Sequence, residues 1–368
     1  MKSNGKTLVR VSLVKAMILL AEDYGLKDYK DSLVMLLNGD VWSYSEQVKT
    51  LSWQDQSEYR AAYLLSEVFT KSVLFDQCDK ASREHASIVK YWSAESACAR
   101  VNRMLACGDD AWIPLQNGDS LRSILEDTRR KIASILGPFD FDEWLASCEF
   151  GNGANVGVTR REACLPNKIG HLEPTVTPGL SEFAKRVVGS YRAWFVQQGR
   201  DSAQYIVTPY SEFIMVPKNA ESERIISKEP LLNSYLQRGI GVMMRSRLIS
   251  AGTGINLHDQ SINQRAAMQG SIDGRLATVD LSNASDSISR GLTEVLAPDD
   301  WLAALLATRS ERGRGESFPE EILFEKVSSM GNGWTFEWET IVFYSLAWSL
   351  AKRCSMDATS IRVYGDDI

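Results

Sequence analysis

One stretch of the sequence decides the fold: Ile361-Arg362-Val363-Tyr364-Gly365-Asp366-Asp367. Its β-branched residues alternate with Arg362, which predicts a half-buried β-strand. Gly365 then gives the backbone freedom that a tight turn needs. The turn carries two adjacent carboxylates, which repel each other unless a cation lies between them. This pattern predicts either a Mg²⁺ site or a solvated Asp-Asp turn, and the rest of the chain decides between them.

The composition is that of an ordinary globular protein, with 44% hydrophobic and 24% charged residues. A chain of 368 residues is long enough for two or three domains. No apolar run reaches membrane-spanning length. The apolar segment 11–21 is interrupted by Lys15 and followed by Glu22 and Asp23, where a signal peptide would need small residues. We therefore expect an amphipathic helix there, and no membrane partner.

The cysteines and histidines show no metal-binding or disulfide pattern. The six cysteines contain no Cys-x-x-Cys pair, and the three histidines are far apart in the sequence. We therefore expect reduced thiols and histidines with structural roles.

Charge is unevenly distributed along the chain. The net charge of −6 argues against a general nucleic-acid binder, because such proteins are usually basic. However, residues 236–275 contain five arginines and only two aspartates. An acidic chain with a basic middle is typical of a protein that holds phosphates in an internal channel.

Residues 213–228 predict two short strands joined by a charged turn. Lys218, Arg224 and Lys228 can meet on one surface of this hairpin and bind a triphosphate. Arginine offers phosphate a bidentate fork, and lysine offers a point charge. The alternative is a solvated hairpin, in which glutamates of the same segment cancel the positive charge. This segment alone does not distinguish the two.

Residues 237–249 predict a helix with Arg238 and Arg245 on one face, because the two are seven residues apart. Such a pair can contact the phosphate backbone of an RNA template. The alternative is an ordinary solvated helix face.

A second carboxylate segment precedes the Asp-Asp turn in the chain. Residues 276–281 predict an apolar strand with Asp280 near its end, where a bare charge would be costly. Asp286 follows in a polar turn, where its alternative role is to cap the next helix. Residues 309–319 predict a polar, flexible connection.

A glycine-containing loop, Gly331-Asn332-Gly333, precedes a long apolar segment at 336–353. The apolar residues surround this segment almost fully, which predicts a buried helix. Glu337 and Glu339 suit the dipole of its first turn. The loop allows another backbone or a nucleotide to approach closely.

The order of these features resembles motifs F, A, B and C of the palm polymerases. Five segments carry a closer resemblance, to the RNA-directed RNA polymerases of the leviviruses, which are single-stranded RNA bacteriophages. These segments are Val216-Pro217-Lys218-Asn219, Ile255-Asn256-Leu257 with residues 259–265, residues 277–289, residues 328–337 and Val363-Tyr364-Gly365-Asp366-Asp367-Ile368. The resemblance covers residues 205–368, is weaker in residues 148–159 and is slight in residues 1–130.

The resemblance implies an α+β fold of the right-hand palm polymerase type, with an antiparallel palm sheet and packed helices. Residues 1–136 would form a mostly helical N-terminal region that extends the fingers or palm. Residues 137–270 would form the fingers with basic motif F, and residues 271–368 the palm motifs A, B and C. The family continues with a return strand, motifs D and E and a thumb. We therefore expect this chain to be a fragment of a longer polypeptide, truncated after the catalytic turn and without a thumb.

The resemblance also implies the site residues. Asp280 and Asp366 would be the main ligands of two Mg²⁺ ions, for which Mn²⁺ can substitute. Asp367 would be an ancillary ligand, and the Leu281 carbonyl would join the coordination. The nucleotide-binding residues would be Lys218, Arg224 and Lys228 at the triphosphate, and Asp286, Gly331, Asn332 and Thr335 at the ribose. Five residues separate Asp280 from Asp286, where many relatives have four. This difference leaves open whether the Asp286 side chain points toward the ribose.

The implied function is replication of a phage genome in the cytoplasm of the infected bacterial host. The implied partners are a single-stranded RNA template, nucleoside triphosphates, the host elongation factors Tu and Ts and a ribosomal protein. Three alternatives stay open. They are a reverse transcriptase-like palm polymerase, a narnavirus- or mitovirus-like polymerase, and a non-catalytic RNA-binding subunit of a replication complex.

Overall fold

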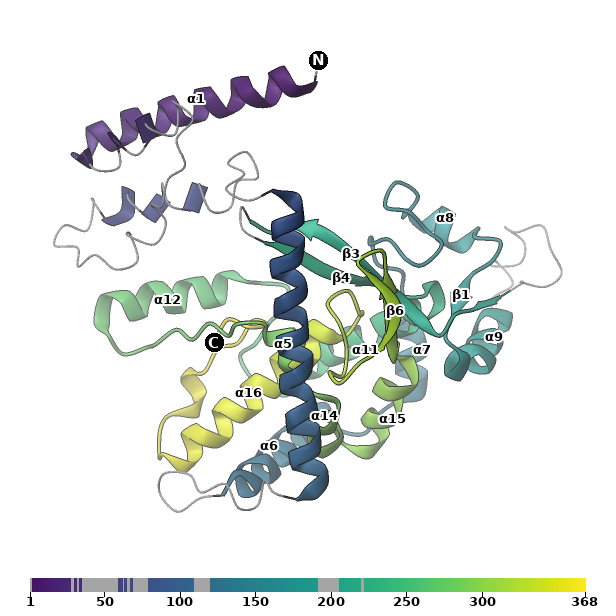
Figure 1. The fold of residues 1–368 in the computed structure, drawn as a ribbon. Helices are drawn as coiled ribbons and strands as arrows, with labels where there is room; N and C mark the ends of the chain where they lie inside the picture. Colours follow the sequence, from purple (N-terminus) through teal and green to yellow (C-terminus); the bar gives the residue numbers. More distant parts are fainter. Residues whose placement is uncertain are drawn as a thin grey trace. The chain divides into compact units, whose positions relative to one another are not determined.

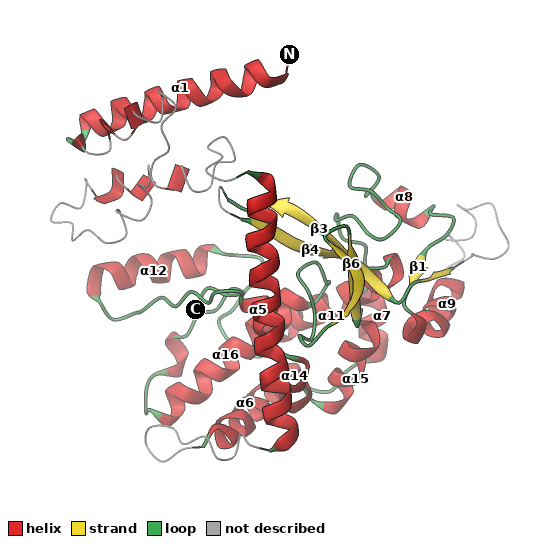
Figure 2. Ribbon diagram, viewed as in Figure 1, coloured by secondary structure: helices red, strands yellow, loops and turns green. Residues whose placement is uncertain are grey.

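The computed structural model describes residues 2–27, 30–31, 33–34, 59–61, 63–64, 67–68, 79–108, 120–190, 205–219 and 222–368. These residues form helices and small sheets, so the α+β class is confirmed (Figures 1 and 2). The chain divides into two compact units, one of residues 1–90 with 215–225 and one of residues 91–214 with 226–368.

The first unit begins with helix α1 (Lys2–Asp23), which confirms the helix expected at 11–21. Val14, Met17 and Ala21 are buried and lie three and four residues apart, on one helix face. Arg83 and Glu223 form a buried ion pair at 2.9 Å between Nε and Oε1 in this unit. None of the helices in the described ranges is long and apolar enough to cross a membrane.

The second unit is mainly helical. Its helices are the later part of α5 (Lys80–Cys107), α6 (Leu121–Leu136), α7 (Phe141–Ser147), α8 (Leu165–Ile169), η3 (Pro178–Leu180), α9 (Ser181–Ser190), α11 (Leu231–Ser250), α12 (Ser261–Asp273), α13 (Ala284–Ser287), α14 (Arg290–Leu296), α15 (Asp299–Thr308), α16 (Thr335–Arg353) and η4 (Ala358–Ser360). The helices predicted at 237–249 and 336–353 are confirmed as α11 and α16. Trp301, Trp334 and Trp338 are fully buried in the core that these helices share.

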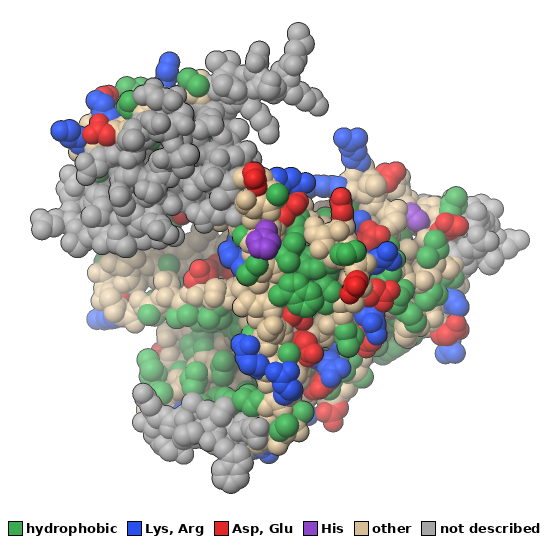
Figure 3. Space-filling view, in the orientation of Figure 1, with side chains coloured by type: hydrophobic (Ala, Val, Ile, Leu, Met, Phe, Trp, Pro, Cys, Tyr) green, Lys and Arg blue, Asp and Glu red, His purple; other side chains and the backbone are tan. Residues whose placement is uncertain are grey.

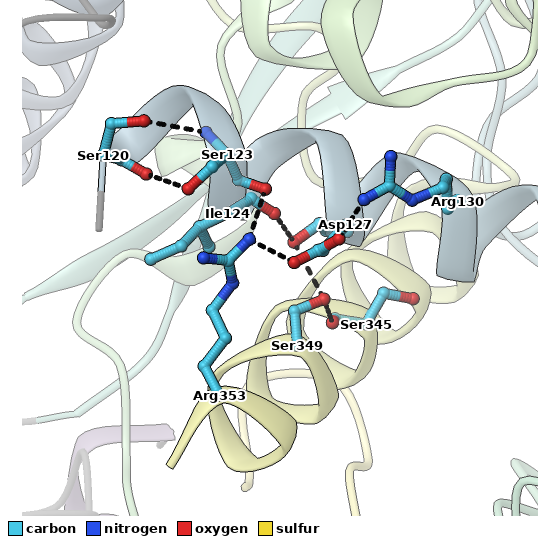
Figure 4. Close-up of polar contacts among 9 residues, drawn as sticks. Ser120, Ser123, Ile124, Asp127, Arg130, Ser345, Ser349 and Arg353 are labelled. Atoms are coloured by element: carbon cyan, nitrogen blue, oxygen red, sulfur yellow. Dashed lines mark hydrogen bonds and ion pairs between the residues drawn. The ribbon is translucent and has the colours of Figure 1, made fainter. Parts of the chain in front are cut away.

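Helix α16 is anchored against α6 by polar contacts (Figure 4). Ser120 caps α6, where its Oγ accepts a hydrogen bond from the Ser123 N–H at 3.2 Å. Arg353, the last residue of α16, donates to the Ser123 carbonyl at 2.9 Å and forms an ion pair with Asp127. The Thr128 hydroxyl donates to Ser349 Oγ at 3.3 Å. These contacts fix the C-terminal end of α16, and its N-terminal end carries the loop at 331–333.

A four-stranded sheet has the order β4-β3-β5-β6. Strands β3 (Tyr210–Pro217) and β4 (Glu223–Lys228) confirm the two paired strands predicted at 213–228, while residues 220 and 221 of the turn between them lie outside the described residues. Strand β5 (Arg312–Gly315) pairs in parallel with β3 and antiparallel with β6 (Phe318–Leu323). A second, two-stranded sheet pairs β1 (Thr175–Val176) in parallel with β2 (Ile206–Val207).

Strands β5 and β6 lie where we expected a polar, flexible connection at 309–319, and that expectation was wrong. A Cβ atom on Gly313 would lie only 2.4 Å from the ring of Phe213 and 2.7 Å from the ring of Phe324. Glycine therefore serves here to let two aromatic rings pack against a strand, and not to make the chain flexible.

The strands predicted at 276–281 and 361–364 do not form as regular strands. Instead, Asp280 and Tyr364 each make an isolated antiparallel bridge with Asp367. Val279 N–H donates to the Ile368 carbonyl at 2.8 Å, and Ile368 N–H donates back at 3.1 Å. Within the described chain, segment 276–281 pairs along one edge only, so Val279 stays 48% exposed and Asp280 is exposed. The expectation of a costly charge at the end of a buried strand was therefore wrong.

Candidate active site

The three aspartates that the sequence singled out lie on two paired segments. Asp280 lies opposite Asp367, and Asp366 precedes Asp367 in the turn. Gly365 has a φ of +65°, a left-handed conformation that favours glycine. A Cβ atom at Gly365 would lie 2.4 Å from the ring of Phe336. The first turn of α16 therefore holds the acidic turn closely.

Two further contacts fix the backbone of this turn. Gly365 N–H donates to Thr340 Oγ1 of α16 at 3.0 Å. Asn263 of α12 donates from its side-chain amide to the Asp367 carbonyl at 3.1 Å. The aspartate backbones are thus held from two sides, while all three side chains are exposed.

The electrostatics of the three aspartates are those of a site that lacks an internal cation. Partial burial and the charges of Asp366 and Asp280 raise the pKa of the Asp367 carboxyl. No Lys, Arg or His in the described ranges forms an ion pair with any of the three. No group of three or more Asp, Glu, His or Cys side chains in those ranges is arranged closely enough to hold a metal ion by itself. The donor set of carboxylate oxygens, with the Leu281 carbonyl directly after Asp280, suits Mg²⁺ or Mn²⁺.

Glu339 is an acidic residue of the site that the sequence reasoning missed. Its carboxyl is buried on α16, beside the backbone of Gly365. Burial, with the charges of Asp366, Glu337 and Asp286, raises the pKa of Glu339 to about 8. The sequence predicts a buried helix here and a favourable interaction of Glu339 with the helix dipole, but no local pattern shows that Glu339 lies beside the acidic turn.

The loop before α16 is also closely packed. Gly331 has a φ of +112°, and a Cβ atom there would lie 2.2 Å from the Ser227 carbonyl. Ser227 N–H donates to the Met330 carbonyl at 2.8 Å, and Gly333 N–H donates to Gln237 Oε1 at 3.2 Å. This loop is therefore held between β4 and α11, and its glycines allow that approach.

The two polar side chains expected at the ribose differ in their partners. The hydroxyl of buried Thr335 lies 2.6 Å from Ser328 Oγ. Asn332 accepts a hydrogen bond from the Trp334 N–H at 3.0 Å, but its buried amide nitrogen has no partner among the described residues. A pocket of about 240 Å³ opens here, lined by loops 151–154 and 331–333 with Lys168, Arg238 and Phe336. The glycine-rich loop at 151–154 thus forms one wall of a cavity.

The three basic residues expected at the triphosphate lie on the β3–β4 hairpin. Lys218 and Arg224 are exposed and form no ion pair with any described acidic residue. Glu223 pairs with Arg83 instead, so this glutamate does not cancel their charge. Lys228 differs, because it forms an ion pair with Glu212 of the neighbouring strand.

The two arginines on α11 are used differently. Arg238 pairs with Glu149 at 2.9 Å, where both side chains are partly exposed. Arg245 donates to the buried Glu337 at 2.6 Å and to the Leu257 carbonyl at 3.1 Å. Arg245 therefore ties α11 to α16 within the fold.

The basic character of segment 236–275 is reduced by such pairs. Arg247 also forms an ion pair, with Glu143 of α7. On the face drawn in Figure 3, Lys and Arg side chains are interspersed with Asp and Glu. A basic channel is therefore not evident from the arginine count of this segment alone.

Asp286 has an internal cation. Its Oδ1 accepts a hydrogen bond from the Lys326 ammonium at 2.8 Å. It does not cap the following helix, because Ser289 caps α14 by accepting from the Leu292 N–H at 3.1 Å. The structure thus separates Asp286, which is neutralised within the fold, from the three aspartates at the turn.

Comparison with known proteins identifies the family. The family model described as "RNA replicase, beta-chain" matches residues 32–368. The chain belongs to this RNA replicase β-chain family. The RNA-directed RNA polymerase subunit beta of Escherichia virus Qbeta is 36% identical over 315 residues, which are 84% of this chain and 50% of that protein. The RNA-directed RNA polymerase beta chain of Escherichia phage MS2 is 36% identical over 315 residues, which are 83% of this chain and 55% of that protein.

A third relative, the RNA-directed RNA polymerase subunit beta of Enterobacteria phage SP, is 33% identical over 364 residues, which are 95% of this chain and 57% of that protein. This replicase β-chain therefore spans about half the length of the curated relatives it matches. The levivirus resemblance that we inferred from the five motif segments is confirmed. The family match also extends into the N-terminal region, where the sequence motifs gave little resemblance.

Proposed function

We propose that this chain carries the nucleotide- and metal-binding part of an RNA-directed RNA polymerase that copies a single-stranded RNA phage genome. The observation that carries the proposal is the pairing of Asp280 with Asp367 beside Asp366, with no described cation to neutralise them. Membership of the replicase β-chain family supports it. Repulsion among exposed carboxylates has little use within the fold itself, so we infer that they serve an external cation.

In this proposal, Asp280 and Asp366 are the main ligands of two Mg²⁺ ions, and Mn²⁺ can substitute. Asp367 is an ancillary ligand, and the Leu281 carbonyl joins the set. Bound divalent ions would supply activation of the attacking 3′-hydroxyl and neutralisation of the charge on the phosphates and the leaving pyrophosphate. The contacts of Gly365 with Thr340 and Phe336 would keep the carboxylates in place before the ions bind.

The incoming nucleotide is assigned to two groups of residues. Lys218, Arg224 and Lys228 would bind the triphosphate. The first two support this role, because they are exposed and pair with no acidic residue that the structure describes. Asp286, Gly331, Asn332 and Thr335 would surround the ribose, and the unpartnered amide of Asn332 supports a ligand there. Arg238 and Arg245 would contact the RNA backbone. For Arg245 this role competes with its pairing to Glu337.

The wider organisation is proposed on the family resemblance. Residues 271–368 would belong to the palm, residues 137–270 to the fingers and residues 1–136 to an N-terminal extension. The enzyme would act in the cytoplasm of the infected bacterium, with the host elongation factors Tu and Ts and a ribosomal protein as partners. Co-purification of tagged protein from infected cells tests these partners, and recovery of the chain without any of the three would remove them from the proposal.

The test of the activity is RNA-templated incorporation of labelled nucleotides with Mg²⁺. The assay uses the natural product that contains this chain and runs ribo- and deoxyribonucleoside triphosphates in parallel. Ribonucleotide incorporation that depends on template and metal, and that is lost in Asp366→Asn, would support the proposal. Preferential incorporation of deoxynucleotides on an RNA template would replace it with a reverse transcriptase. Template binding with activity unaffected by Asp366→Asn would indicate a non-catalytic subunit.

A further inference from the structure

Helix α5 presents one face to the segment that contains Asp286. Tyr91, Glu95, Cys98 and Asn102 follow one another at spacings of four, three and four residues, so they share a helix face. The first three are buried. The sequence gave this helix no role, and Cys98 on it lies 188 residues before Asp286 in the chain.

Two of these residues hold the backbone around Asp286. The Cys98 thiol donates to the Asp286 carbonyl at 3.3 Å, and burial raises the pKa of this thiol to about 12, so it stays protonated. Asn102 accepts from the Gly291 N–H at 2.8 Å and donates to the Glu325 carbonyl at 2.9 Å. Helix α5 thus bridges the segment after Asp280 and the segment before the loop at 331–333.

The other two residues hold a buried lysine. Lys326 is 1% exposed, and its ammonium lies 2.8 Å from Asp286 Oδ1 and 3.5 Å from Glu95 Oε1. The same ammonium lies 4.2 Å from the centre of the Tyr91 ring, in cation–π geometry. A buried ammonium is unfavourable unless it is paired, so these three partners account for its position.

Backbone and aromatic contacts fix both sides of the lysine. Lys326 forms an antiparallel bridge with Ser289, and Val327 N–H donates to the Ile288 carbonyl at 2.9 Å. The Tyr91 ring packs against Phe213 of β3, with ring centres 5.4 Å apart. The lysine therefore has little freedom to move away from Asp286.

We propose that Lys326, held by Tyr91 and Glu95 of α5, is a positioning residue that fixes the Asp286 carboxylate for selection of ribose over 2′-deoxyribose. The inference rests on the proposed function, in which Asp286 contacts the sugar. Only Oδ1 of Asp286 is bonded within the described chain, and the side chain is 25% exposed. The second oxygen is available to accept a hydrogen bond from a 2′-hydroxyl.

The chemistry explains why the carboxylate must be held. A carboxylate that accepts from a substrate hydroxyl rejects the analogue that lacks it, because the acceptor is then left unpaired. This discrimination requires a fixed acceptor, and a mobile side chain would turn to solvent at little cost. Lys326 holds the Asp286 side chain in one orientation through this 2.8 Å contact. Helix α5, far away in the sequence, thereby becomes a determinant of sugar specificity.

The test measures kcat and KM for GTP and dGTP in single-nucleotide extension of an RNA primer–template, using the natural product that contains this chain. We expect Lys326→Met to lower the ribose preference by about tenfold or more, mainly through a higher KM for GTP. Lys185→Met, which removes an exposed ion pair with Glu182, is the matched control and should leave the preference unchanged. Unchanged preference in folded Lys326→Met protein would overturn the proposal.

A double-mutant cycle separates positioning from a general structural role. If Lys326 acts through Asp286, adding Lys326→Met to Asp286→Asn should change the preference no further, whereas additive effects would overturn the proposal. Lys326→Met alone leaves the buried carboxylate of Glu95 without its cationic partner, which can prevent folding. In that case the double variant Glu95→Gln/Lys326→Met, which removes this buried charge, is used for the test.

Binding measured by calorimetry with Mg²⁺ and GTP or dGTP gives a readout that does not need turnover. One outcome is that the protein binds GTP more tightly than dGTP, that this preference depends on Lys326, and that no RNA-templated synthesis occurs. This outcome would contradict the proposed polymerase function and leave the positioning role of Lys326 intact. Synthesis whose ribose preference is insensitive to Lys326 would contradict the positioning role alone. Equal affinity of the wild-type protein for GTP and dGTP, in binding and in turnover, would also overturn the inference.

Discussion

Two groups of carboxylates in this chain differ in how their charge is balanced. Asp280, Asp366 and Asp367 are exposed, adjacent and without a described cationic partner. Asp286 lies only six residues after Asp280, yet its carboxylate is bonded to the buried ammonium of Lys326. In the first group, no described cation offsets the repulsion between the carboxylates, and we propose that an external cation does so. Asp286, in contrast, already has a cationic partner within the fold. Nearby acids can thus be prepared for different tasks by the presence or absence of an internal cation.

The first and largest expected effect tests the unbalanced group. Asp366→Asn should lower RNA-templated incorporation by about three orders of magnitude or more, because charge stabilisation by the metals is lost. The melting temperature should stay the same or rise, because one repelling carboxylate is removed. Asp299→Asn, at an exposed position on α15, is the control and should keep full activity. A large loss of stability in Asp366→Asn would show that the acidic turn has a structural role. The three aspartates would then no longer differ from Asp286 in being unbalanced within the fold.

The second prediction concerns Glu339, whose pKa is raised to about 8. The neutral form is favoured in the fold, so its contribution to stability is complete below the unfolded-state pKa of about 4.3 and is lost as pH rises through about 8. Without divalent ions, the free energy of unfolding should fall by up to about 4 kcal/mol between pH 5 and pH 8. Urea titrations at several pH values measure this loss.

Glu339→Gln should flatten that dependence, while Glu320→Gln on exposed β6 should preserve it. Saturating Mg²⁺ should reduce the dependence in the wild-type protein, because a cation at the turn offsets the charge of Asp366. The same pH dependence in wild type and Glu339→Gln would mean that this carboxyl is not coupled to the acidic turn.

The third prediction compares two arginines on α11. Arg245→Met should destabilise the fold by about 3 kcal/mol or more, because it leaves the 3%-exposed carboxylate of Glu337 without its partner. Arg238→Met should cost less than about 1 kcal/mol, because its pair with Glu149 is solvent-accessible. Denaturant unfolding measures both. Equal costs would show that burial does not distinguish the two ion pairs.

RNA binding gives a second measurement of the role of Arg238. Arg238→Met should weaken template binding about equally for all RNA sequences. It should also reduce the slope of log binding constant against log salt concentration by about one, because one phosphate contact is lost. Filter binding of a labelled RNA over a range of salt concentrations measures the slope. No change in slope would remove Arg238 from the proposed template contacts.

The fourth prediction concerns the turn that presents the three aspartates. Gly365→Ala should cost about 2–4 kcal/mol, from the left-handed backbone and from contact with the Phe336 ring. Gly274→Ala is a matched control with a φ of +67° but no atom within 4 Å of the added Cβ, so it should cost only about 1–2 kcal/mol. Urea unfolding measures both costs. If they agree, packing against α16 does not hold the acidic turn.

Local patterns predicted much of the fold. The β3–β4 hairpin, helices α11 and α16 and the glycine turn all follow from residues within a few positions of one another. The strands expected at 276–281 and 361–364 failed because their partners in the described chain cover one edge only. Strand β5 was missed because Arg312-Gly313-Arg314-Gly315 looks flexible. Only the tertiary structure explains its glycines, because the rings of Phe213 and Phe324 pack against Gly313 and the Phe213 carbonyl lies against Gly315.

The sequence by itself determined the family, the order of the motifs and the identity of the three aspartates, because these depend on residue types at fixed spacing. Only the tertiary structure decided which charges are balanced. Lys326 reaches Asp286 across 40 residues, Arg245 reaches Glu337 across 92, and Glu339 is buried beside the turn at Gly365. Such pairings depend on how distant segments pack, and burial then sets the cost of each charge. No local pattern of residues carries that information.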